Sequence, residues 1–436
     1  MESSQLFVDW LRGVAPYVHA HRGKTFVIGV SGEVLRDHAL RTWVDDVALL
    51  SALGVRVVLV FGSRPQIEAQ LQLKGLISEF HDDVRVTDLA ALECAKEAAG
   101  EIRLDLEAAF SQALPDTPMA HAELQAVSGN FVTARPLGII DGIDFQHTGV
   151  VRKINTSGIS RLLDAGCVVL LPPLGFSPTG ESFSVSMEDA ATSTAIALDA
   201  DKLIFITETA GVLDAQGELL SELNASDARV LLQQPHLDVA TYFYLEAACR
   251  ACEAGVARTH ILAGALDGML LLEMFTRRGV GTMVVEQSLS VLRAATLDDV
   301  GAIVRLIEPL EADGTLVYRG RERLESEIEH FYVLEHDQMI DGCVALYLYS
   351  ESMAEMACLT VDPKHQGKGD GERILHFIEQ QAKAKGVKQL FVLTTRTTHW
   401  FQKRGFRVAS VNDLPENRRH LYNQNRKSAV LIKVLG

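Results

Sequence analysis

Long apolar stretches are missing from this 436-residue sequence, and no segment runs for 18 residues without a polar side chain. A helix that spans a bilayer needs about 20 mainly apolar residues, so we expect no membrane span and no membrane partner. The first residues also lack the basic start and apolar run of a secretory leader. We therefore expect a cytoplasmic protein.

Basic residues are too few for a protein that binds polyanions. The chain has 41 Lys and Arg against 57 Asp and Glu, a formal net charge of −16, which argues against nucleic acid as a partner. The charge is also uneven, because acidic and basic residues balance over residues 289–436. The whole excess therefore falls on residues 1–288, which indicates two units.

Cysteines are scarce, with six in the chain. That number in so long a sequence does not indicate a disulfide scaffold. Cys249 and Cys252 form a CxxC pair, but no second pair or histidine motif lies near them in the sequence. We expect them to be buried small residues in a helix, and we expect no metal site.

The order of apolar runs predicts an α/β protein. After an amphipathic helix over residues 5–20, continuous apolar strands alternate with Gly-containing turns and helices up to residue 285, which is typical of an open, mostly parallel sheet. The pattern then changes to antiparallel strands and a mixed sheet. We expect domains at 1–286 and 291–436 with a linker at 287–290, and a turn at Asp341-Gly342 between strands 331–335 and 342–349.

A glycine-rich turn, Gln366-Gly367-Lys368-Gly369-Asp370-Gly371, follows an expected strand and opens an expected helix. Backbone amides at such a helix start bind phosphate, although a plain turn has the same composition. The spacing of Gln and Gly in this turn resembles the pyrophosphate-binding loop of the GNAT acetyltransferases, and the segment 400–406 resembles a late helix of the same family. The resemblance implies acetyl-CoA, with the pantetheine against the strand 355–361. The cofactor-binding residues that it implies are Cys358, Leu359, Val361, Gln366, Gly367, Gly369 and Gly371.

Acetyl transfer to an amine needs a base, a stabilised oxyanion and a proton for the thiolate. Glu355 starts the strand that leads into the loop, so we expect it to be the general base, against the alternative of a solvated edge carboxylate. The amide of Cys358 or Leu359 is a candidate oxyanion donor. We favour direct attack over an acetyl-Cys358 intermediate. The family often has a tyrosine that protonates the leaving thiolate, but this chain has Phe401 at that position. Thr394, Thr395 and Tyr422 therefore remain as candidates for this acid.

Two separated basic clusters in the second unit suit a dicarboxylic acceptor, because arginine binds carboxylates with two parallel hydrogen bonds. Solvated surface arginines are the simpler alternative. The segments 391–396, 399–401 and 421–428 resemble the bacterial N-acetylglutamate synthases, which implies L-glutamate as acceptor and the first step of arginine biosynthesis. The expected substrate-binding residues are Arg319, Arg321, Arg426 and Ser428.

Residues 25–285 resemble the amino-acid kinase fold, and acetylglutamate kinase most closely, through the segments 62–67, 184–189 and 203–214. The kinases carry a lysine in the first strand, where this chain has Gly29. A second lysine is replaced by Tyr244 or Leu245. Phosphoryl transfer without these cations would lose charge stabilisation, so we expect the kinase chemistry to be lost.

The segment 260–282 resembles the arginine-binding segment of arginine-inhibited acetylglutamate kinases. The resemblance implies feedback inhibition by L-arginine and a ring-like homo-oligomer, a hexamer, with interlaced N-terminal helices. The expected arginine-site residues are Tyr17, Lys202, His260, Glu273 and Gly279. The alternatives that stay open are an acetylglutamate kinase, a bifunctional synthase and kinase, and a non-enzymatic arginine sensor.

Overall fold

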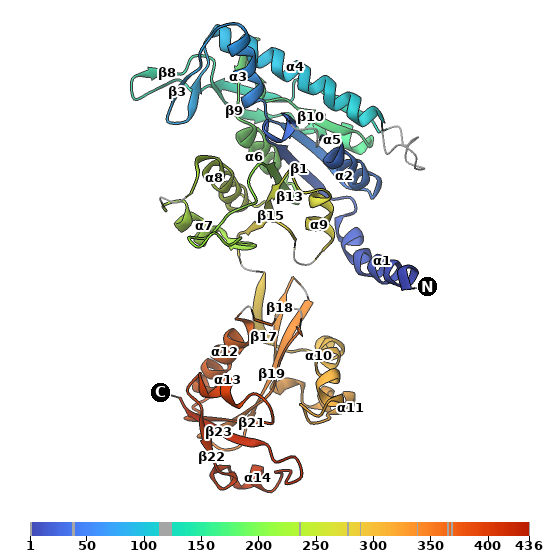
Figure 1. Ribbon diagram of the computed structural model, residues 1–436, viewed down its shortest axis with the longest axis vertical. Helices are drawn as coiled ribbons and strands as arrows, with labels where there is room; N and C mark the ends of the chain where they lie inside the picture. Colours follow the sequence, from blue (N-terminus) through green and yellow to red (C-terminus); the bar gives the residue numbers. More distant parts are fainter. Residues whose placement is uncertain are drawn as a thin grey trace. The chain divides into compact units, whose positions relative to one another are not determined.

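The computed structural model describes residues 2–36, 40–112, 124–234, 237–276, 279–287, 289–337, 339–363, 366–367 and 369–435. The chain forms two compact units, residues 1–287 and 288–436 (Figure 1). No helix within these described ranges is both long and apolar enough to cross a membrane.

Unit 1 is built on an eight-stranded sheet in the order β14-β16-β15-β13-β1-β2-β10-β5. Neighbouring strands are parallel except for β15 and β16, so the expected open, mostly parallel sheet is confirmed. The strands are β1 (Thr25–Val30), β2 (Arg56–Phe61), β5 (Ala126–Ser128), β10 (Val168–Leu171), β13 (Lys202–Thr207), β14 (Glu222–Asn224), β15 (Arg258–Ala263) and β16 (Thr282–Val285).

Helices cover both faces of this sheet (Figure 1). Alternate residues of β1 and β13 point to opposite faces, and both sets are buried. Phe26, Ile28 and Ile204 belong to the core under α2 (Leu40–Ala52), α4 (Leu89–Gln112) and α9 (Met269–Phe275). Val27 and Phe205 belong to the core under α5 (Thr156–Asp164), α6 (Met187–Ala197) and α8 (Val239–Glu253). Burial on both faces explains why these strands are continuously apolar.

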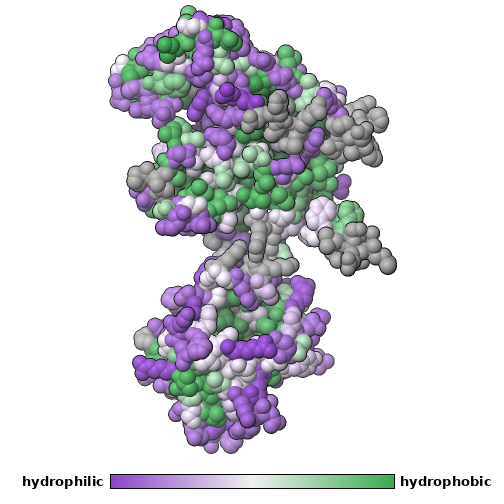
Figure 2. Space-filling view, viewed as in Figure 1, coloured by the Kyte–Doolittle hydropathy of each residue, from purple (hydrophilic) through white to green (hydrophobic). Residues whose placement is uncertain are grey.

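Smaller elements complete unit 1. They are α1 (Glu2–His21), α3 (Arg64–Leu73), α7 (Ala225–Leu231), a sheet of β12 (Ser182–Ser184), β11 (Leu174–Phe176), β6 (Val132–Pro136) and β9 (Gly149–Ile154), and the hairpins β3–β4 (Glu79–His81, Val84–Val86) and β7–β8 (Ile139–Ile140, Ile143–Asp144). Figure 2 shows apolar residues gathered over the region of α7, α8 and α9, where Val230 and Val239 are exposed.

The CxxC cysteines are buried in α8 as expected. Burial raises the pKa of the Cys249 thiol to about 12, and it also raises the pKa of Cys252. Cys252 contacts the Thr259 hydroxyl and the Val284 carbonyl oxygen, so it serves packing between α8 and the sheet.

Unit 2 is built on a seven-stranded mixed sheet in the order β17-β18-β19-β20-β21-β23-β22, in which β20 and β21 are the parallel pair. The strands are β17 (Ser290–Ala294), β18 (Phe331–His336), β19 (Met339–Leu348), β20 (Met353–Val361), β21 (Gln389–Thr394), β22 (Arg407–Ala409) and β23 (Ala429–Val434). Because β17 begins at Ser290, the sheet takes up the last residue of the expected linker.

Helices cover both faces of this sheet as well. On one face, α12 (Asp370–Ala384) and α13 (Thr398–Gln402) pack through Ile374, Ile378 and Phe401. On the other, α10 (Val300–Ala312) and α11 (Gly320–Ser326) pack through Ile303 and Leu324. The short α14 (Glu416–Arg419) precedes the last strand.

The expected turn at Asp341-Gly342 is wrong, because both residues lie within β19 and the strand begins at Met339. Asp-Gly is a common hairpin turn, but here the glycine is needed for close packing. A Cβ on Gly342 would lie 2.8 Å from Ile374 Cδ1 and 2.9 Å from the Thr360 carbonyl oxygen. Glycine therefore lets α12 and β20 approach β19.

Candidate active site

The sheet of unit 2 opens between β20 and β21. The two strands pair only over Met353–Glu355 and Gln389–Phe391. Beyond Glu355, the described part of β20 has a strand neighbour on one side alone, which is β19. The backbone groups of β20 that face away from β19 are therefore available to a ligand that carries amide groups.

A bulge lies in the open part of β20. The register with β19 pairs Ala357 with Ala345 and Thr360 with Cys343, and it passes over Cys358 and Leu359. Cys358 has φ = 53°, a left-handed backbone that is uncommon outside glycine. Bulges redirect backbone groups out of the ladder, so this one can aim an amide of Cys358 or Leu359 into the opening.

The glycine-rich turn leads from this strand into α12. Gln366 Nε2 donates to the Val361 carbonyl oxygen at 3.1 Å, which ties the turn to the end of β20. Gly369 is the N-cap residue of α12, with φ = 89°. The first amides of a helix lack intrahelical partners and carry positive partial charge, so this end of the 15-residue α12 suits a diphosphate. Lys368 lies outside the described residues.

Cys358 is buried beside an arginine. Arg319 Nη1 lies 2.7 Å from Cys358 Sγ. Burial raises the pKa of the Cys358 thiol to about 11, although the Arg319 charge opposes the rise. The thiol is therefore protonated near neutral pH, whereas a nucleophilic cysteine needs its thiolate.

Arg319 and Arg426 lie near one another. Burial first, and then the Arg319 charge, lowers the pKa of Arg426. Arg426 donates to the Thr315 carbonyl oxygen. The Nε atoms of Arg319 and Arg426 are both buried and have no hydrogen-bond partner among the described residues. Two partly buried guanidinium groups with spare donors suit a carboxylate ligand.

Glu355 is held by a third arginine, which the sequence analysis did not single out. Arg418 Nε lies 2.6 Å from Glu355 Oε2, and Arg418 Nη2 lies 3.1 Å from Oε1. Burial and then Glu355 raise the pKa of Tyr349 to about 12, so its hydroxyl stays protonated beside this pair. The sequence signal available was the pair Arg418-Arg419 shortly before Tyr422, but nothing in it indicated the contact with β20.

Other predicted residues have different surroundings. Arg321 does not join the arginine cluster, because it is exposed on α11 and pairs with Glu325 at 2.8 Å. The Ser428 carbonyl oxygen accepts a hydrogen bond from the Tyr422 hydroxyl at 2.7 Å. Thr394 and Thr397 exchange a hydrogen bond between their hydroxyls at 2.8 Å.

In unit 1, three expected arginine-site residues form a chain of contacts. His260 Nε2 lies 3.3 Å from Lys202 Nζ, and His260 Nδ1 lies 2.7 Å from Glu273 Oε1. Burial and then the Lys202 charge lower the pKa of His260 to about 4. A neutral His260 therefore accepts from Lys202 and donates to Glu273.

The remaining two residues of that expected site lie on neighbouring segments. Glu273 accepts from the backbone amides of Val280 and Gly281, and its carboxylate lies against Gly279. These bonds and His260 outweigh burial and lower the pKa of Glu273. Tyr17 packs on the core that α9 shares.

The positions of the missing kinase lysines are filled. A side chain at Gly29 would collide with Met187 and Phe205. Tyr244 is buried against Phe205, with ring centroids 5.6 Å apart. Neither Gly29 nor Tyr244 therefore supplies a cation for a phosphate.

These features match two known families. The amino acid kinase family model matches residues 24–263, and the acetyltransferase (GNAT) domain model matches residues 327–408. Fold and site therefore define a GNAT acetyltransferase unit that follows an amino-acid-kinase-like unit.

Relatives that match over nearly the whole chain show which acetyltransferases it is similar to. An amino-acid acetyltransferase of Ralstonia nicotianae is 59% identical over 432 residues, which cover 99% of this chain and 96% of the relative. One from Azotobacter vinelandii is 49% identical over 430 residues, 98% of this chain and 99% of the relative. The crystal structure of N-acetylglutamate synthase from Neisseria gonorrhoeae complexed with coenzyme A and L-arginine matches with 39% identity and a TM-score of 0.87, covering 98% of this chain and 99% of that one. This chain belongs to the amino-acid acetyltransferase family, and the relatives support that interpretation rather than the kinase alternative.

Proposed function

We propose that this enzyme transfers the acetyl group of acetyl-CoA to the amino group of L-glutamate, as the first step of arginine biosynthesis, and that L-arginine inhibits it. The observation that carries the proposal is the open edge of β20, which runs from the buried Glu355 past the bulge at Cys358 to the turn before α12. The relative that was crystallised with coenzyme A and N-acetyl-glutamate supports the choice of ligands.

In the proposed reaction, the turn with Gln366, Gly367, Gly369 and Gly371 binds the diphosphate. The pantetheine amides pair with β20 along Cys358, Leu359 and Val361. An amide at the bulge then stabilises the oxyanion as the amine attacks the thioester carbon. The protonated state of the Cys358 thiol supports direct attack over an acetyl-cysteine intermediate.

Glu355 is the proposed base, which takes a proton from the glutamate ammonium through water. Its ion pair with Arg418 fixes the orientation of the carboxylate at the start of the open edge. Arg319 and Arg426 are proposed to bind the acceptor's carboxylates, with Ser428 beside them. We add Tyr349 to Thr394, Thr395 and Tyr422 as a candidate acid for the thiolate.

The proposed arginine site uses Tyr17, Lys202, His260, Glu273 and Gly279. Glu273 supports it, because a buried carboxylate is a strong partner for a guanidinium. We further propose a cytoplasmic homo-oligomer, a hexamer by family resemblance. The exposed apolar side chains Phe7, Trp10 and Leu11 of α1 support contacts between copies, and size-exclusion chromatography with light scattering tests the number.

The deciding experiment measures thiol release from acetyl-CoA with each of the twenty amino acids, with and without added arginine. The proposal expects release with glutamate and suppression by arginine. A hydroxamate assay with ATP and N-acetylglutamate is the matched test for the kinase alternative. Thiol release that does not depend on glutamate would contradict the assignment.

A further inference from the structure

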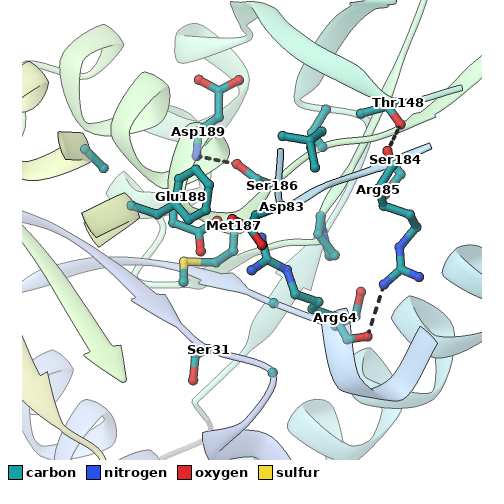
Figure 3. Close-up of a pocket in the computed structure, with 18 of the residues that line it drawn as sticks. Ser31, Arg64, Asp83, Arg85, Thr148, Ser184, Ser186, Met187, Glu188 and Asp189 are labelled. Atoms are coloured by element: carbon teal, nitrogen blue, oxygen red, sulfur yellow. Dashed lines mark hydrogen bonds between the residues drawn. The ribbon is translucent and has the colours of Figure 1, made fainter. Parts of the chain in front are cut away.

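A cavity of about 280 Å³ in unit 1 has no part in the functions proposed above. It lies among the ends of β1 and β2 and the first residues of α3 and α6, and α8 closes it with Phe243 and Tyr244. Figure 3 shows Ser31, Arg64, Met187 and Glu188 around this space. The volume is at the small end of the range for small-molecule sites.

Carboxylates dominate the charge of the lining. Burial first, and then Glu208 and Glu188, raises the pKa of Glu33, while Arg64 opposes the rise. These three carboxylates are therefore close enough to repel one another. Arg85 and Arg250 also line the cavity, but they are held in ion pairs with Glu68 and Asp189.

A buried hydroxyl in the same lining is unsatisfied. Ser63 is 2% exposed and is the N-cap residue of α3, yet its side chain makes no capping bond. Its Oγ has no hydrogen-bond partner within the described ranges. A buried polar group without a partner is costly, so a ligand atom in the cavity would stabilise it.

The charge excludes one class of occupant and favours another. Glu33, Glu188 and Glu208 would repel a phosphate, and the positions of the missing kinase lysines supply no cation, which leaves Arg64 against three carboxylates. Ile67 and Phe243 add apolar lining that suits a short carbon chain. We propose that this cavity binds a small aliphatic amine as its ammonium ion, held by Glu33, Glu188, Glu208 and the Ser63 hydroxyl.

Two sources supply this chemistry, namely a diamine and an amino acid with an amino side chain. The amino acid adds a carboxylate, for which Arg64 is the partner in the lining. Replacing Arg64 therefore separates the sources. If the amino acid is the better ligand, Arg64→Gln should weaken the binding of L-ornithine severalfold. The affinity for 1,4-diaminobutane should stay unchanged.

Calorimetric titration of the full chain with 1,4-diaminobutane and with L-ornithine tests the site. We expect saturable binding of at least one amine, weakened tenfold or more by Glu188→Gln and by Glu208→Gln. The control is Glu218→Gln, because Glu218 is an exposed residue of unit 1 outside the lining. This variant should bind the amines as tightly as the unaltered chain does. Urea unfolding followed by the fluorescence of Trp43, which is buried in unit 1, serves as the check on folding.

Glu273→Gln separates this site from the proposed arginine site, because it should leave diaminobutane binding unchanged. The proposal is overturned if neither amine shows binding at amine concentrations up to about 10 mM. It is also overturned if the Glu188 and Glu208 variants bind as tightly as the unaltered chain, or if a non-hydrolysable ATP analogue binds in place of the amines.

Discussion

Arg418 binds both carboxylate oxygens of Glu355, and their side chains are 16% and 7% exposed. The pair joins α14 to β20 beside the point where β20 leaves β21. An arginine that donates two parallel hydrogen bonds stabilises the ionised carboxylate and fixes its orientation. The same contact therefore fixes the orientation of Glu355 at the start of the sheet's open edge.

Removing one partner of this pair should destabilise unit 2. A buried ion that loses its partner costs about 3–5 kcal/mol, so Arg418→Gln or Glu355→Gln alone should lower the free energy of unfolding by that order. The double variant should lose much less than the sum of the two. Urea unfolding of all four proteins forms a double-mutant cycle, with exposed Arg321→Gln as the control. Additive losses would show that the two side chains are not coupled.

Glu355→Gln should also lower kcat a hundredfold or more, because a positioned base contributes about that much. The amide is isosteric and cannot take up a proton. If Glu355 is the base, raising the pH should recover part of the rate as free glutamate loses its ammonium proton. Thiol release measured from pH 7 to 10 checks this. A variant with reduced kcat and no pH recovery would point to a positioning role instead.

Arg319→Gln and Arg426→Gln should raise the KM for glutamate tenfold or more and leave the KM for acetyl-CoA within about twofold, because a charged hydrogen bond contributes roughly 1.5–3 kcal/mol. Arg321→Gln is the matched control, since it removes the same charge two residues away at an exposed position. Steady-state kinetics with each substrate varied in turn gives the answer. An equal loss in Arg321→Gln would mean that overall charge, and not contact, is responsible.

The order of apolar runs and glycine-containing turns in the sequence was sufficient to predict the fold class. The apolar strand Thr25–Val30 is completely buried, as its sequence indicated, because helices cover both faces. Asp341-Gly342 misled because a hairpin signal and a close-packing glycine have the same letters. What distinguishes them is the approach of Ile374 and Thr360, which come from α12 and β20.

The candidate site was predicted less completely. Glu355 and Arg418 are 63 residues apart in sequence, so no spacing rule indicates their contact. Arg319 and Arg321 look equivalent in sequence, but the helix begins between them, at Gly320. Arg319 precedes α11 and reaches Cys358, whereas Arg321 faces solvent beside Glu325.

Gly369→Ala should weaken acetyl-CoA binding. Gly369 has φ = 89°, and an alanine in the left-handed region costs about 1–2 kcal/mol, so the turn before α12 would change shape. Gly386→Ala is the matched control, because Gly386 also has a positive φ, 80°, but follows the other end of α12 and lies outside the turn. Calorimetric titration with coenzyme A should show a loss of several-fold for the first variant alone. Equal losses would show that strain at either end of α12, and not the shape of the turn, weakens binding.

The buried His260 should make unit 1 sensitive to acid. Its pKa is lowered to about 4, chiefly by burial, whereas in the unfolded chain the pKa is about 6.5. The unfolded state binds the proton first, so the stability from neutral His260 is full above pH 6.5 and is lost as the pH falls to 4, by up to about 3 kcal/mol. The lowered pKa of Glu273 acts in the same direction at still lower pH.

Fluorescence of Trp43, which is buried in unit 1, reports this loss in urea unfolding at pH 7, 6 and 5. Trp400→Phe removes the tryptophan of unit 2, so that the signal follows unit 1. His260→Gln cannot take up the proton, and its stability should therefore depend less on pH across this range. Parallel pH dependences for the two proteins would show that another group is responsible. Arginine, if it binds at Glu273, should raise the stability of the unaltered chain at pH 7 by mass action.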